Sequence, residues 1–207
     1  AGDPAAAPRL RESINRVLAN ASADGRFGLW SPGGDDLWLD AFATDFLSRA
    51  RERGYAVPQA ALDAALDNLK NLGGYTSPGP GDAYALHVLA RNGRASIGDL
   101  RYLADERLSD LGTPLAKAQI GAALALYGDR TRADAALAAA AADLGRSGVL
   151  SGAGGWRADY GSPLRDAAAL LALAAESGSD AIDLRALAGR IQDQVARQPY
   201  RSTQEDT

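Results

Sequence analysis

One unit recurs along this chain: a glycine-containing turn with an aromatic residue, then a polar residue with proline, then a helix rich in alanine and leucine. Thr113-Pro114 and Ser162-Pro163 are clear examples. A side-chain oxygen can cap the first backbone N–H groups of a helix, and proline fits its first turn. Glycine-rich loops at 23–36, 73–81 and 145–162 separate such units. The repetition predicts stacked helical hairpins.

The stretch 37–53 shows the helical pattern most strongly. Its aromatic residues recur every four positions, which places them on one face of a helix: Trp38, Phe42 and Phe46. We expect this face to be apolar and buried, with Asp40 and Ser48 mostly turned away from it. Asp45 falls beside the aromatic row, so its carboxylate must find a partner or lie at the edge of the face.

The same reasoning predicts about ten helices. Nine are complete: 10–21, 37–53, 58–72, 83–91, 96–108, 115–127, 131–144, 164–177 and 183–197. Asp82 is a plausible cap for the fourth, and Ser202 with Glu205 forms a capping box before a tenth. Valine and isoleucine number ten together, without strict alternation, so a sheet is not expected. The fold class is all-α, either an open solenoid or a closed α/α ring.

The composition of the chain excludes several classes of function. The 207 residues fit one domain, and 46% hydrophobic residues with 23% charged ones are ordinary for a globular protein. A net charge of −4 with scattered basic residues argues against nucleic acid as a partner. Without cysteine there is no disulfide, thiolate metal site or cysteine nucleophile. No apolar run is long enough to span a bilayer, so we expect no membrane contact by this segment.

Few residues suggest chemistry. His87, the one histidine, has no acidic or cysteine companion nearby in sequence, so we interpret it as a packing or surface residue. Five aspartates lie in or beside the glycine-rich loops and could pair as acid and base in a carbohydrate-active α/α-barrel enzyme: Asp24, Asp35, Asp36, Asp82 and Asp159. Aspartate in a turn is more often a cap or turn former. A helical-repeat binding module without chemistry is a further alternative.

The segment 159–166, with the sequence DYGSPLRD, combines an aromatic residue, a helix cap and both charges. It could be a recognition edge. We favour a helix entry, because Asp166 would lie near the positive N-terminal end of the helix macrodipole.

Several of these stretches together resemble a known family. The sequences at 24–30, 38–50, 54–58, 159–166 and 202–205 resemble, in order, the thioester-domain region of bacterial α2-macroglobulins. The resemblance implies an α/α toroid of helical hairpins, similar to the terpenoid-cyclase fold and incomplete here. In that family this region belongs to a large periplasmic protease trap, in which cleavage of a bait segment lets a thioester acylate the protease.

The chain departs from the family at the thioester itself. The family's Cys-x-Glu-Gln motif has no match here, because cysteine is absent. Either the motif lies upstream of Ala1 in a parent protein, or the parent belongs to the branch without a thioester. The histidine that assists acyl transfer in some relatives would fall near residues 73–81, so that role is not carried over to His87.

We therefore expect residues 1–207 to be one domain, the larger part of a thioester-type domain truncated at both ends. It would be a non-catalytic piece of a periplasmic, broad-spectrum protease inhibitor, with no cofactor or metal. Its partners would be other domains of the parent chain and, through the parent, target proteases. The candidate interdomain surface comprises loop residues at one end of the ring: Trp30, Tyr75, Trp156, Asp159, Tyr160 and Arg165.

Overall fold

The computed structural model describes residues 6–71, 77–147, 157 and 159–197. These residues form α-helices and one short 3-10 helix, in the order α1 (Ala6–Ala19), α2 (Leu37–Glu52), α3 (Gln59–Lys70), α4 (Pro80–Arg91), α5 (Ile97–Glu106), η1 (Leu108–Leu111), α6 (Pro114–Leu126), α7 (Arg130–Ser147), α8 (Pro163–Ser177) and α9 (Leu184–Arg197). The extended pairing in this part of the chain is a single isolated bridge between Ala21 and Phe27. The all-α prediction is confirmed. The start of a tenth helix at Ser202 lies outside the described residues.

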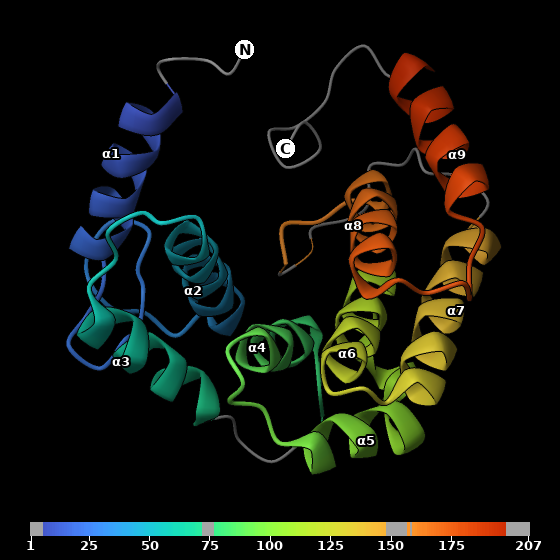
Figure 1. Ribbon diagram of the computed structural model, residues 1–207, viewed down its shortest axis with the longest axis horizontal. Coiled ribbons are helices and arrows are strands. Elements are labelled where there is room, and N and C mark those ends of the chain that lie inside the picture. Colours follow the sequence, from blue (N-terminus) through green and yellow to red (C-terminus); the bar gives the residue numbers. More distant parts are fainter. Residues whose placement is uncertain (1–5, 72–76, 148–156, 158, 198–207) are drawn as a thin grey trace.

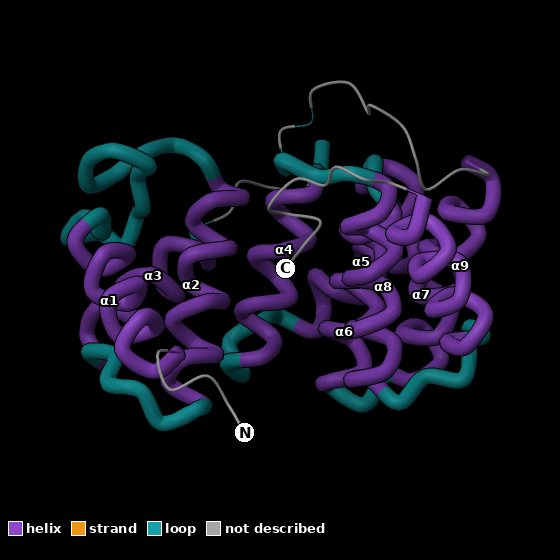
Figure 2. The backbone as a smooth tube through the Cα atoms, turned by 90° about the horizontal axis from the view of Figure 1, so that it is seen from above, coloured by secondary structure: helices purple, strands orange, loops and turns teal. Residues whose placement is uncertain are grey.

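The helices form two layers along an arc. Figure 1 shows α2, α4, α6 and α8 on the inside of the curve and α1, α3, α5, α7 and α9 on the outside. Each inner helix contacts the next one along the arc, and outer helices pack against the inner layer. Figure 2 shows the same helices from the side, with the connecting loops gathered at their two ends. This alternation is that of stacked hairpins, and closure into a toroid stays a prediction.

Small side chains let the two layers approach closely. Helix α6 lies at the centre of the arc, and its residues from Leu115 to Ala125 are all buried. At Gly121, an added Cβ would lie 3.0 Å from the carbonyl oxygen of Ala133 in α7. Alanine and leucine fill most of the rest of the core, which runs as three apolar clusters along the arc.

Most helix starts follow the sequence prediction. The hydroxyl oxygens of Thr113 and Ser162 accept from backbone N–H groups at distances of 3.1 and 3.2 Å, and each precedes a proline at the first helical position. The cap predicted at Asp82 is wrong. Helix α4 begins at Pro80, because proline is preset for the first turn, and Asp82 reaches back from inside the helix to accept from Gly79 N at 2.8 Å.

The buried face of α2 also differs from the prediction. Its small and aliphatic residues are buried: Ala41, Thr44, Leu47 and Ser48. Phe42 is half exposed, and Trp38 is only partly buried. Asp40 and Ser48, both expected to turn outward, are buried. The Asp40 carboxylate accepts from Phe27 N at 2.7 Å and from Asn68 Nδ2 at 2.9 Å, and the Ser48 hydroxyl donates to Asn92 Oδ1 at 3.1 Å. Trp38 instead packs beside Tyr84 of α4, with the ring centroids 5.8 Å apart.

Candidate functional site

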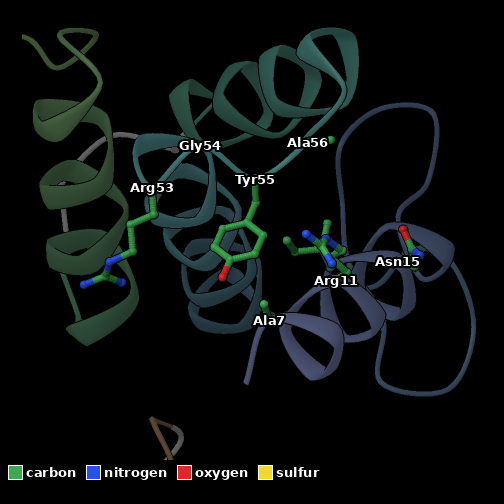
Figure 3. A pocket seen from close by; sticks show the side chains of 8 residues that line it. Ala7, Arg11, Asn15, Arg53, Gly54, Tyr55 and Ala56 are labelled. Carbon is green, nitrogen blue, oxygen red and sulfur yellow. The ribbon is translucent and has the colours of Figure 1, made fainter. Parts of the chain in front are cut away.

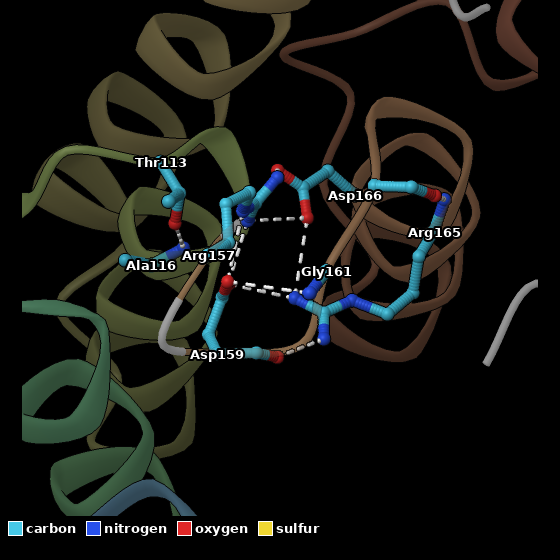
Figure 4. Close-up of polar contacts among 8 residues, drawn as sticks. Thr113, Ala116, Arg157, Asp159, Gly161, Arg165 and Asp166 are labelled. Carbon is cyan, nitrogen blue, oxygen red and sulfur yellow. Dashed lines mark hydrogen bonds and ion pairs between the residues drawn. The ribbon is translucent and has the colours of Figure 1, made fainter. Parts of the chain in front are cut away.

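Four charged residues form a buried cluster where the chain enters α8. The carboxylates of Asp159 and Asp166 are almost fully enclosed, and the guanidinium groups of Arg157 and Arg165 lie between them (Figure 4). Arg157 donates to Asp159 at 2.6 Å and to Asp166 at 3.0 Å, while Arg165 donates to Asp159 at 2.8 Å. Two positive and two negative charges therefore balance inside the fold, as buried ions require.

The pKa values in this cluster follow from burial and from the paired charges. Burial by itself would raise the pKa of Asp159, but hydrogen bonds and charges from Arg157 and Arg165 outweigh it and lower that pKa. For Asp166, which is more deeply enclosed, burial dominates and raises the pKa. The carboxylate oxygens already accept hydrogen bonds, so the cluster supports the backbone around it and offers no free acid or base.

The cluster holds Tyr160 against α2. Tyr160 has a left-handed backbone with φ of 53°, an unusual conformation for a residue with a side chain. Its ring lies 5.6 Å from that of Trp38, and its hydroxyl donates to Asp36 at 3.4 Å. The Arg165 guanidinium lies 5.7 Å from the Trp38 ring centre, within cation–π range. The segment before α8 thus contacts the first inner helix of the arc (Figure 1).

This arrangement can be compared with known proteins. No family model matches the chain. It is 36% identical to alpha-2-macroglobulin of Escherichia coli K12, over 61% of this chain and 8% of that protein. The structure of E. coli alpha-2-macroglobulin activated by porcine elastase aligns over 99% of this chain and 19% of its own, with a TM-score of 0.83 and 30% identity. Salmonella alpha-2-macroglobulin reacted with methylamine aligns over 100% and 14%, with a TM-score of 0.80 and 34% identity.

The chain belongs to the bacterial alpha-2-macroglobulin family. The sequence match covers 8% of the E. coli relative and the structural matches cover 14% to 19% of the relatives' chains, so the chain corresponds to a small part of those much larger proteins.

A second polar network joins α2 and α4 in the inner layer. Asp45 accepts from Arg49 Nε at 3.0 Å and from Tyr84 Oη at 3.1 Å, and it lies 3.6 Å from Arg91. The prediction that Asp45 needs a partner is confirmed. Burial and the nearby Asp45 carboxylate raise the pKa of Tyr84 well above its usual value. The Asp45 carboxylate is therefore paired, whereas the buried Nε of Arg91 makes no hydrogen bond with the described residues.

His87 is the packing residue that the sequence predicts. It lies in α4 with 3% of its surface exposed, and burial lowers its pKa to about 4, so the imidazole is neutral at pH 7. Its Nδ1 atom makes no hydrogen bond with the described residues. His87 is also one of the residues that line a small cavity of about 110 Å³ between α4, α6 and α8.

The loop aspartates do not form a pair of free carboxylates. Asp24 accepts from the Ser22 hydroxyl at 2.5 Å, and Asp35 pairs with Arg26 at 2.6 Å. Asp36 caps α2 by accepting from Trp38 N at 3.0 Å. Asp82 and Asp159 have the partners given above. These carboxylates act as caps, turn formers or ion-pair partners, so the carbohydrate-active alternative is not favoured.

A larger cavity, of about 570 Å³, lies between α1 and the turn from α2 to α3 (Figure 3). The side chains of Arg11, Asn15, Arg53 and Tyr55 are its polar lining residues, and its described lining contains no carboxylate. Acid–base glycoside chemistry has no pair of groups there. Within the described ranges, no group of three histidine, cysteine or acidic side chains could hold a metal ion, and none of the helices has the length and apolar character to cross a bilayer.

The six residues predicted for an interdomain surface have different environments. Trp30 is 94% exposed and Tyr160 is 44% exposed. Asp159 is buried, contrary to a surface role, because two arginines neutralise it, and Arg165 is largely covered by the same cluster. Tyr75 and Trp156 lie outside the described residues. The sequence interpretation missed exposed Leu29, although its position beside Trp30 in an uncharged loop tip was a usable signal.

Proposed function

We propose that this chain is a non-catalytic segment of a broad-spectrum protease inhibitor, and that it forms the larger part of a thioester-type domain in the parent protein. The observation that supports this most is the likeness to bacterial alpha-2-macroglobulins along essentially the whole chain. The E. coli relative has been solved activated by porcine elastase, which supports proteases as partners of the parent. The engaged loop aspartates favour this role over an enzymatic one.

The thioester part of the proposal rests on chemistry seen in a relative. The Salmonella protein was solved after reaction with methylamine, and a small amine is a nucleophile that cleaves thioesters. This chain has no cysteine, so a thioester would use residues of the parent outside it. The helical arc would be completed into a toroid by further hairpins of the parent. The family resemblance also supports a periplasmic location and contacts with other domains of the parent.

Digestion assays with the parent protein test the inhibitor role. Elastase is incubated with the parent and then offered either a protein-sized substrate or a small peptide substrate. A trapped protease is expected to lose most activity on the large substrate and to keep it on the small one. Unchanged cleavage of both substrates would overturn the proposal.

Reaction with methylamine distinguishes a parent protein that has a thioester from one that lacks it. If a thioester is present, pretreatment with methylamine adds the mass of one amine to the parent and prevents SDS-resistant complexes with elastase. A parent that traps elastase without incorporating methylamine belongs to the branch without a thioester, which contradicts the thioester assignment and leaves the inhibitor role standing.

A further inference from the structure

The loop between α1 and α2 is anchored firmly at its base. Phe27 is buried in the core with 3% of its surface exposed, and its backbone N–H donates to Asp40 of α2. The other oxygen of Asp40 accepts from Asn68 of α3. The isolated bridge between Ala21 and Phe27 closes the loop at the same point. One buried carboxylate therefore joins the loop to two helices.

Glycines let the loop fold tightly above this base. An added Cβ on Gly28 would lie 1.9 Å from the carbonyl oxygen of Ser31 and 2.5 Å from that of Gly33, so the loop backbone leaves no room for a side chain there. At Gly25, whose φ is +83°, an added Cβ would lie 2.2 Å from the carbonyl oxygen of Ala64 in α3. The loop thus packs against itself and against the helix, which defines the position of its tip.

Two large apolar side chains project from that tip. Leu29 is 57% exposed and Trp30 is 94% exposed, and residues 27–34 carry no charge. The charges at the base are internally paired through Arg26 and Asp35. Because the loop backbone is already tightly packed, presenting Trp30 to a partner costs little further backbone entropy, and tryptophan is among the residue types enriched at binding hot spots. The tip is therefore an uncharged, preorganised anchor.

The other exposed apolar residues are less suited to this role. Tyr160 and Phe42 belong to the aromatic group around Trp38, where their rings already have partners in the chain. Tyr102 and Leu126 are exposed singly on α5 and α6, which is common on protein surfaces. Figure 2 shows the loop between α1 and α2 at the same end of the helices as the segment that enters α8.

We infer that Leu29 and Trp30 anchor this segment by inserting into an uncharged apolar pocket on another domain of the parent chain. The inference rests on the proposed function, because it takes the occupant from the parent: the chain spans 8% of the E. coli relative and 14% of the Salmonella chain, so most of such a protein is available to cover the tip. The absence of charge in the tip matches an apolar pocket better than an acidic or basic surface.

Photo-crosslinking in the intact parent tests the inference. A photoreactive amino acid replaces Trp30, and in a matched control it replaces Tyr102, which is also exposed but stands on α5. Irradiation at position 30 is expected to give an intramolecular crosslink to one apolar segment of another domain, identified by mass spectrometry, and position 102 is expected to give none. A crosslink between two copies of the parent, or no crosslink at position 30, would overturn the inference.

Hydrogen exchange provides a second readout. Trp30→Ala in the parent is expected to raise amide exchange in the crosslinked segment at least about 10-fold, as for loss of a binding hot spot, while Tyr102→Ala leaves it unchanged. Because Trp30 makes little contact with its own chain, the helical fold should be retained, which circular dichroism checks. Elastase trapping is measured on the same unmodified parent. Trapping without a crosslink at position 30 contradicts this inference alone, whereas loss of trapping contradicts the proposed function.

Discussion

The hydroxyl of Tyr160 donates to the Asp36 carboxylate at 3.4 Å, although the two residues stand 124 positions apart in the chain. Asp36 caps the first turn of α2, and Tyr160 immediately precedes the entry to α8. The contact therefore connects the beginning of the inner layer with its last helix. The four-residue ion cluster behind Tyr160 fixes the backbone from which this side chain extends.

Two replacements of Tyr160 distinguish the stability that its side-chain contacts contribute from the strain of its left-handed backbone. Tyr160→Ala removes the ring contact with Trp38 and should lower the free energy of unfolding by about 1–2 kcal/mol. Tyr160→Gly loses the same contacts but relieves the left-handed backbone, so it should be more stable than the alanine variant by about 1 kcal/mol. Urea unfolding of the three chains measures the order. A glycine variant less stable than the alanine variant would contradict this account of the strain.

The ion cluster should contribute far more to stability than an exposed pair. Asp166→Ala leaves two largely buried arginines facing one remaining carboxylate, and we expect it to lower the free energy of unfolding by about 3 kcal/mol. Asp105→Ala, which breaks the more exposed pair with Arg132, is the control and should change it by at most about 1 kcal/mol. Equal losses in thermal or urea unfolding would show that burial of the cluster does not matter.

Local sequence signals predicted the helices well, because capping depends on neighbouring residues. Ser96 is an example: its hydroxyl accepts from Asp99 N, three positions away. The buried face of α2 depends instead on distant groups. Asp40 is buried only because Phe27 N and Asn68, 13 and 28 positions away, satisfy its carboxylate. The spacing of residues within α2 cannot predict these hydrogen bonds, because their partners lie outside the helix.

The same limit applies to the candidate site. The segment 159–166 could be recognised as a helix entry from its own residues, and Ser162 does cap α8. That its charges point inward depends on Arg157, which bridges Asp159 and Asp166. The 94% exposure of Trp30 is likewise a tertiary feature that composition does not specify.

His87 should make the chain less stable as the pH falls through the weakly acidic range. Its pKa is about 4 in the folded chain and 6.5 in the unfolded one. Burial is the main cause of the lower value, and the positive charges of Arg91 and Arg49 add to it. The Asp45 carboxylate acts in the opposite direction but is outweighed. Between about pH 6.5 and pH 4, the imidazole is therefore protonated in the unfolded chain and neutral in the folded chain. The stability that His87 contributes is complete above the unfolded pKa and lost across this window, by up to about 3 kcal/mol.

His87→Gln isolates this effect. Urea unfolding is measured from pH 7 to pH 4 for both chains. Over that range the free energy of unfolding of the variant should fall by about 3 kcal/mol less than that of the original chain. Raised pKa values at Asp40 and Asp166 act in the opposite direction, but both chains contain these groups, so their contributions cancel in the comparison. Parallel pH profiles would mean that His87 titrates alike in the folded and unfolded chains.

Gly25 and Gly54 provide a matched test of the loop that carries Trp30. Both have φ of +83°, but an added Cβ meets nothing within 4 Å at Gly54, whereas at Gly25 it would lie 2.2 Å from the Ala64 carbonyl oxygen. Gly54→Ala should therefore lower the free energy of unfolding by about 1 kcal/mol, because alanine is strained in this backbone conformation. Gly25→Ala adds a steric clash and should cost about 2–4 kcal/mol in total. Urea unfolding gives both values, and equal losses would mean that the loop does not pack tightly on α3.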